Sequence, residues 1–118
     1  MSELQVVDSY QRVHRATLNE YNVALALQTC DLLFMFQVDF FGGRSLRGGQ
    51  VLDFLVFNPM PTPVQVFGDH WHEGQLGTED SYKLSLIQEQ YGRDVVIFFQ
   101  LDTDTYDHAL AAVKGQLL

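Results

Sequence analysis

The 118-residue chain has one cysteine, three prolines and only seven lysine and arginine residues. A single cysteine, Cys30, excludes an internal disulfide and fits a reducing compartment, so we expect a cytoplasmic protein. No apolar run reaches membrane-spanning length, and the first residues lack the pattern of a signal peptide, so we expect no membrane partner. The formal charge of −8 argues against broad electrostatic adhesion to nucleic acid. Any surface that binds nucleic acid would have to be a local one, formed by some of these seven basic side chains.

Apolar residues are plentiful, at 47% of the chain with nine Phe and five Tyr, which is typical of a folded protein. At this length we expect a single domain over residues 17–118. Residues 1–16 are polar and predict a partly helical N-terminal arm.

Capping and turn signals divide the domain into helices and strands. Thr17 and Glu20 form a capping-box pattern that begins a helix. The expected elements are a helix over 17–28, strands over 32–41, 51–57 and 64–68, a helix over 78–91, a strand over 94–101, and a last helix starting within 102–107. Prolines make 58–63 a turn, and strand 94–101, apolar on both faces, is expected at the sheet centre. This order predicts an α/β fold in which an antiparallel meander is joined by a helical crossover to a fourth strand.

An acidic residue stands inside the second expected strand. Asp53 lies in the apolar segment 51–57, where a carboxylate costs desolvation free energy unless it is paired, hydrogen-bonded or bound to a metal. One interpretation is a functional carboxylate. The other is a carboxylate turned outward at a sheet edge or paired with an arginine.

Several short motifs in this order resemble the PD-(D/E)XK, or restriction-endonuclease-like, fold, and most closely the very-short-patch-repair (Vsr) endonucleases and their small uncharacterised relatives. The matching pieces span about Thr17 to Asp102: Glu20 in the first helix, Asp53-Phe54 in the second strand, Gly68-x-x-Trp71-His72 after the third strand, Asp80-x-x-Lys83 in the next helix, and the apolar strand after Tyr91-Gly92. The resemblance implies a three-layer sandwich of an N-terminal helix, a three-strand meander, a crossover helix, a fourth strand and a C-terminal helix.

The function that the resemblance implies is metal-dependent hydrolysis of phosphodiester bonds by a DNA endonuclease. Asp53 and Gln65 would hold Mg²⁺ or Mn²⁺, which prefers such hard oxygen ligands. His72 would act as the general base, and Glu20 would support the metal site directly or through water.

Three basic residues are candidates for contact with DNA. Arg44 and Arg47 lie in the glycine-rich segment 42–49, which could approach a phosphate backbone or be an ordinary hairpin turn. Lys83 could point to the scissile phosphate, or pair with Asp80 on a solvated helix face.

The chain also departs from the family pattern. The usual Glu-x-Lys of the third strand is Gln65-Val66-Phe67, so one ligand has lost its charge and the lysine is missing. A nuclease-like fold that has lost catalysis and serves as a structural or interaction subunit is therefore an alternative function. A second alternative is a homodimeric junction-resolving nuclease.

Glu20 and His72 also have purely structural interpretations, and the two histidines suggest a different metal. Glu20 could serve only the capping box, and His72 could merely hydrogen-bond at a strand end. His70 and His72 share a face on an extended strand and could bind Zn²⁺ with an acidic neighbour.

Overall fold

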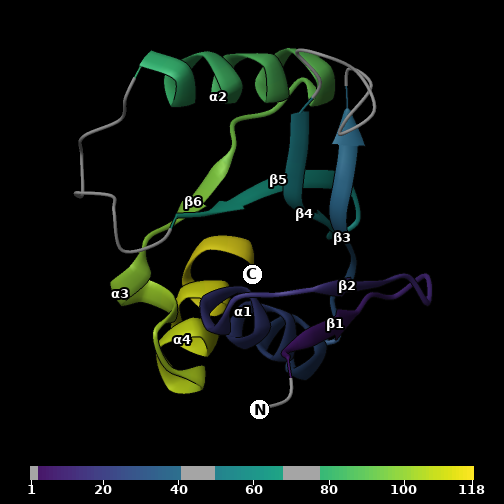
Figure 1. Cartoon of the computed structure of the whole chain (residues 1–118), viewed down its shortest axis with the longest axis vertical. Helices are drawn as coiled ribbons and strands as arrows, with labels where there is room; N and C mark the ends of the chain where they lie inside the picture. The colour runs from purple at the N-terminus through teal and green to yellow at the C-terminus, as the bar shows by residue number, and fades with distance from the viewer. Residues whose placement is uncertain (1–2, 41–49, 68–77) are drawn as a thin grey trace.

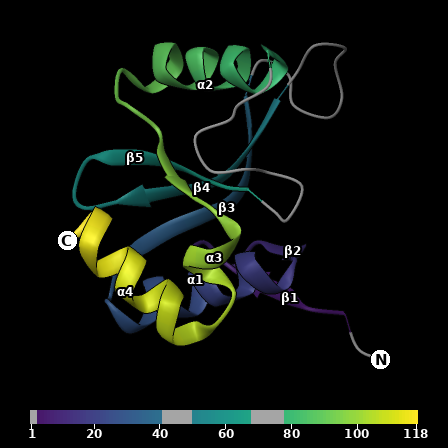
Figure 2. The ribbon, with the colours of Figure 1, turned by 90° about the vertical axis from the view of Figure 1, so that its left-hand side faces the viewer.

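A four-stranded sheet forms the middle of the molecule, with helices packed on both of its faces (Figure 1, Figure 2). The computed structural model describes residues 3–40, 50–67 and 78–118. The helices are α1 (Leu18–Thr29), α2 (Thr78–Tyr91), α3 (Gln100–Thr103) and α4 (Tyr106–Leu117). The strands are β1 (Gln5–Val7), β2 (Val13–Arg15), β3 (Leu33–Phe40), β4 (Gln50–Phe57), β5 (Pro61–Val66) and β6 (Val96–Phe98). Helices α1 and α4 lie together on one face of the sheet, and α2 covers the other.

The order of strands in the sheet is β3-β4-β5-β6. The first three strands are antiparallel neighbours, and β6 pairs with β5 in parallel. Parallel neighbours need a crossover, which α2 supplies between β5 and β6. The predicted meander and helical crossover are therefore confirmed.

The prediction for the fourth strand was wrong in length and position. β6 has three residues and lies at the edge of the sheet. After Phe98 the chain turns into α3, because the Phe99 amide donates to Asp102 Oδ2 at 2.9 Å and Thr103 is buried against α1. The segment is apolar on both sides because Val95 and Val96 pack into different cores, one on the α2 side and one on the α1 side.

Strand β5 begins earlier than predicted, at Pro61 within the proline-rich segment. Residues Pro61 and Pro63 pair with β4, whereas β6 pairs only with Val64–Val66. The first half of β5 therefore has one strand neighbour, and proline is tolerated where the missing amide has no ladder partner to meet.

Residues 3–16 were also predicted wrongly. The partly helical arm is instead an antiparallel hairpin of β1 and β2. Its turn is organised by Asp8, whose Oδ1 accepts hydrogen bonds from the amides of Tyr10 (2.9 Å) and Arg12 (3.0 Å). The polar residues that suggested an exposed arm thus serve a turn.

Two hydrophobic cores lie on opposite faces of the sheet. The core beside α1 and α4 contains aromatic rings in contact, with the Phe36 and Phe54 centroids 4.8 Å apart and the rings tilted by 42°. The core beside α2 contains Leu52, Leu55 and Ile87. No helix in the described ranges is long and apolar enough to cross a membrane.

Candidate functional site

The β4–β5 ladder changes character at Asp53. Regular backbone pairing ends at Phe54 and Val64. At the next position the Asp53 amide donates to Gln65 Oε1 at 2.8 Å, and the Val66 amide donates to Asp53 Oδ2 at 2.8 Å. Each side chain thus completes the backbone hydrogen bonding of the other strand. Asp53 and Gln65, predicted as metal ligands, are held together by this exchange.

A distortion on the other side of β4 directs Asp53 towards α1. In β3, Gln37 has a left-handed backbone with φ of 58°, which is rare for a residue other than glycine. The backbone pairs on either side, Phe36 with Phe54 and Val38 with Leu52, keep the same register, so no residue is inserted.

The same distortion reverses the alternation of side chains along both strands. Phe36 and Phe54 pack on the α1 side, whereas Val38 and Leu52, two residues away, pack on the α2 side. A regular strand would keep residues two apart on one face. The reversal falls at Gln37 and Asp53, whose side chains both interact with α1.

The side chains of Gln37 and Asp53 both interact with Glu20 of α1. Its Oε1 accepts the Thr17 amide at 2.8 Å, and the Glu20 amide donates to Thr17 Oγ1 at 3.2 Å, so the predicted capping box is confirmed. Its other oxygen, Oε2, lies 3.5 Å from Gln37 Nε2. The same carboxyl also interacts with that of Asp53. Capping and membership of the polar cluster are therefore compatible roles for one residue.

The environment of Asp53 opposes its negative charge. Burial is the largest cause of a rise in the pKa of this carboxyl to about 7, and the neighbouring Glu20 contributes to that rise by repulsion and by a hydrogen bond. The Val66 amide and the Lys83 ammonium lower the pKa, but they do not offset the burial. Two acidic groups held together in a half-buried position are an unfavourable arrangement that a cation would relieve.

The donor set suits a hard divalent cation. Mg²⁺ is commonly held by one or two carboxylates while it keeps several waters, and Glu20 and Asp53 supply two. Gln65 Oε1 already accepts the Asp53 amide, which limits its capacity as a ligand. Within the described residues, no group of three or more His, Cys, Asp or Glu side chains gathers as a metal cage would need.

Two positions matter for positive charge near the carboxylates: Phe67, where the family pattern has a lysine, and Lys83 of α2. Phe67 is buried and packs against Phe99 with ring centroids 6.0 Å apart, so this strand position is part of the core. Lys83 of α2 is half-buried and close enough to Asp53 to lower the pKa of that carboxyl. Of the three basic residues predicted for DNA contact, Lys83 is thus near the carboxylate pair. Arg44, Arg47, His70 and His72 lie outside the described residues.

Sequence reasoning missed the hairpin residues that adjoin the site. Arg12 Nη2 donates to the Gln37 carbonyl oxygen at 2.8 Å, and Asp8 Oδ2 accepts the Phe36 amide at 3.1 Å. The positions Asp8 and Arg12 are four apart in a polar segment, a pattern that many exposed turns share. Their partners are distant in sequence, so no local signal identified them.

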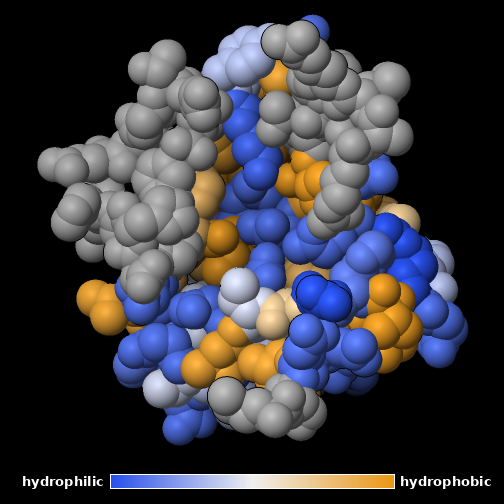
Figure 3. Space-filling model, in the orientation of Figure 1, coloured by the Kyte–Doolittle hydropathy of each residue, from blue (hydrophilic) through white to orange (hydrophobic). Residues whose placement is uncertain are grey.

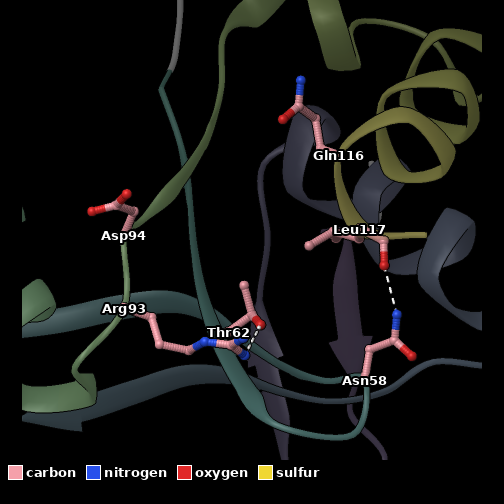
Figure 4. A pocket seen from close by; sticks show the side chains of 6 residues that line it. All are labelled: Asn58, Thr62, Arg93, Asp94, Gln116 and Leu117. Atoms are coloured by element: carbon pink, nitrogen blue, oxygen red, sulfur yellow. Dashed lines mark hydrogen bonds between the residues drawn. The ribbon is translucent and has the colours of Figure 1, made fainter.

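The face of the molecule shown in Figure 1 is hydrophilic along its middle, with apolar patches on either side (Figure 3). A separate cavity of about 370 Å³ lies near the end of α4 and contains none of the predicted site residues (Figure 4). It is lined by Asn58, Thr62, Arg93, Asp94, Gln116 and Leu117. Arg93 donates to Thr62 Oγ1 at 3.1 Å and Asn58 to the Leu117 carbonyl at 2.6 Å, so its polar groups join β5 and α4 to their neighbours.

Comparison with known proteins adds no relative: no family model matches the chain, and neither curated proteins nor solved structures show a significant match.

Proposed function

We propose that the protein is a metal-dependent DNA endonuclease of the PD-(D/E)XK type, similar to Vsr enzymes, with the corresponding three-layer topology. The observation that carries the proposal is the convergence of Glu20 and Asp53 at the β3–β4–β5 distortion, where Gln65 fixes Asp53 in place. These three residues come from three different elements that the family pattern also uses.

The carboxylates of Asp53 and Glu20 are the groups that would hold Mg²⁺ or Mn²⁺, with Gln65 beside them. When bound, the metal would polarise the phosphate and activate the attacking water. The exchange of hydrogen bonds between β4 and β5 orients the Asp53 carboxylate before any ligand arrives, which is the preorganisation that such sites need.

Lys83 has a separate role in the proposal. Its ammonium lies close enough to Asp53 to lower the pKa of that carboxyl, and it would stabilise negative charge on the phosphate, a task that the buried Phe67 cannot perform. With a formal net charge of −8, contact with DNA depends on such local cations, and Arg44 and Arg47 are the other proposed contributors.

Cleavage assays test the proposal directly. Supercoiled plasmid, mismatched duplex and branched DNA are incubated with the protein in Mg²⁺, Mn²⁺ or EDTA. The wild type should cleave at least one of these DNAs with Mg²⁺ or Mn²⁺ and none with EDTA. Asp53→Asn should lower the cleavage rate about 10²-fold or more. The matched control is Asp107→Asn, at an exposed position. Cleavage confined to branched DNA would select the junction-resolving alternative.

His72 supplies an independent test of the base. Replacing His72 by Ala should lower the cleavage rate roughly 10²-fold and leave the melting temperature unchanged. His108→Ala, on α4, is the control for loss of an imidazole elsewhere. Equal rates for His72→Ala and the wild type would assign the base to another group.

The buried Phe67 and the occupied Gln65 oxygen favour one second candidate, a catalytically inactive structural or interaction subunit. This candidate predicts no metal-dependent cleavage of any of the three DNA forms. It also predicts that the double variant Arg44→Ala/Arg47→Ala has the same DNA affinity as the wild type. If the protein is an endonuclease, the double variant should bind DNA more weakly than the wild type and with a shallower salt dependence.

A further inference from the structure

Gln37 has an unfavourable conformation next to the carboxylate pair. Its φ of 58° lies in the left-handed region, within a strand whose other residues pair regularly with β4. Such a backbone costs free energy for a side chain with a Cβ, and it persists when surrounding contacts hold it in place. The contacts that hold Gln37 therefore indicate which parts of the molecule the distortion serves.

The holding contact comes from the N-terminal hairpin. Arg12 Nη2 donates to the Gln37 carbonyl oxygen at 2.8 Å. Arg12 Nη1 lies 3.6 Å from Asp8 Oδ2 in an ion pair, and the Asp8 side chain is wholly buried. Asp8 in turn accepts the Phe36 amide, so the hairpin hydrogen-bonds to the backbone of two consecutive β3 residues, the amide of Phe36 and the carbonyl of Gln37.

The side chain of Gln37 extends this connection to the acidic pair. Its Nε2 lies 3.5 Å from Glu20 Oε2, the oxygen that the capping box leaves available. A connected path thus runs from Asp8 through Arg12 and Gln37 to Glu20, whose carboxyl interacts with that of Asp53.

We infer that Gln37 and Arg12 are positioning residues that fix the Glu20 carboxylate for a divalent cation shared with Asp53. This inference rests on the proposed function, because it concerns the same metal site. Groups that hydrogen-bond to metal ligands orient them, and their loss commonly weakens metal affinity or activity about 10- to 100-fold. The hairpin is therefore a component of the site, although it contributes no ligand.

Two substitutions separate positioning from folding. Gln37→Gly keeps the left-handed backbone without strain and removes the amide that faces Glu20. Arg12→Ala removes the contact to the Gln37 carbonyl. The control is Arg15→Ala in the same hairpin, since Arg15 is 80% exposed and pairs with Glu3 at 3.1 Å.

The measurement is the MgCl₂ concentration at half of the metal-induced rise in melting temperature, with the half-saturating concentration for DNA cleavage as a second readout. Gln37→Gly and Arg12→Ala should each raise both values about 10-fold, while Gln37→Gly melts within a few degrees of the wild type in EDTA. Arg15→Ala should match the wild type.

Wild-type values in Gln37→Gly overturn the inference even if Arg12→Ala fails to fold. If the wild type shows neither a metal-induced rise nor metal-dependent cleavage, the proposed function fails and the inference fails with it. If the wild type shows both and Gln37→Gly is unchanged, the inference alone fails.

Discussion

Asp8 and Asp53 are both acidic residues held against β-strands, yet their surroundings are opposite. The Asp8 carboxylate accepts hydrogen bonds from the amides of Tyr10, Arg12 and Phe36, and an arginine lies 3.6 Å away. Asp53 accepts the amide of Val66 and faces a second carboxyl group. The first acid is surrounded by donors and stabilises the fold. The second has a raised pKa because burial and a neighbouring carboxyl disfavour its charge, and groups perturbed in this way are enriched at functional sites.

The largest expected effect is on folding, at Asp8. Asp8→Ala removes the acceptor of three amides, and each buried donor left without a partner costs about 1–3 kcal/mol. We expect the free energy of unfolding in urea at pH 7 to fall by about 3–5 kcal/mol. Asp107→Ala, an exposed acid in α4, is the control. A loss at Asp8 no larger than at Asp107 would remove the distinction between the two acids.

A change of opposite sign is expected at Asp53. Asp53→Asn keeps an oxygen for the Val66 amide and removes the charge that burial and Glu20 oppose. At pH 8 in EDTA this variant should be more stable than the wild type by roughly 1–2 kcal/mol, because the relief of desolvation and repulsion outweighs the weaker hydrogen bond from the Val66 amide. Asp53→Ala should lack this gain because the Val66 amide loses its acceptor. Urea denaturation of the three proteins decides the outcome.

The gain should depend on pH. Because the pKa of Asp53 rises from 3.8 to about 7, the native state keeps a proton that the unfolded chain has released between these values. The contribution of Asp53 to stability therefore falls as the pH rises from about 4 to about 7 and is constant above it. The gap between Asp53→Asn and the wild type should shrink towards pH 4. A constant gap from pH 4 to pH 8 would contradict the raised pKa.

The smallest expected effect is at Gln65, where a third carboxylate can be added. Gln65→Glu keeps an oxygen for the Asp53 amide and should tighten Mg²⁺ binding about 10-fold, or about 1.4 kcal/mol. In EDTA the same variant should melt at a lower temperature, because a third negative charge joins the pair. Titration of the melting temperature with MgCl₂ measures both. Gln116→Glu, at an exposed position of α4, is the control, and equal behaviour of the two variants would argue against a metal beside Gln65.

Features set by neighbours in sequence could be predicted. The Thr17–Glu20 capping box follows from side chains within one helical turn of the helix start, and the end of α2 at Tyr91 follows from Gly92, which has a left-handed backbone. The isolated acid at Asp53 was recognisable because a carboxylate stands out in an apolar strand. Its closeness to Glu20 was expected from the family resemblance.

Features set by distant contacts could not be predicted. The hairpin around Asp8 depends on the Phe36 amide, 28 residues away. The early end of β6 depends on Thr103, whose carbonyl and hydroxyl oxygens accept the side-chain amides of Asn22 and Asn19 in α1. The left-handed Gln37 has no sequence signal, since glycine or asparagine would be the usual residue there.

The hairpin turn also covers part of one edge of the sheet. β3 is an outer strand of the sheet, and exposed outer strands invite a second chain to add its own strand. Here the Phe34 amide already donates to Ser9 Oγ at 2.9 Å, and the Phe34 carbonyl accepts the Ser9 amide at 3.0 Å. With the Phe36 amide bound to Asp8, this stretch of the edge is closed to strand addition. A protein shortened by its first sixteen residues would expose it and should self-associate.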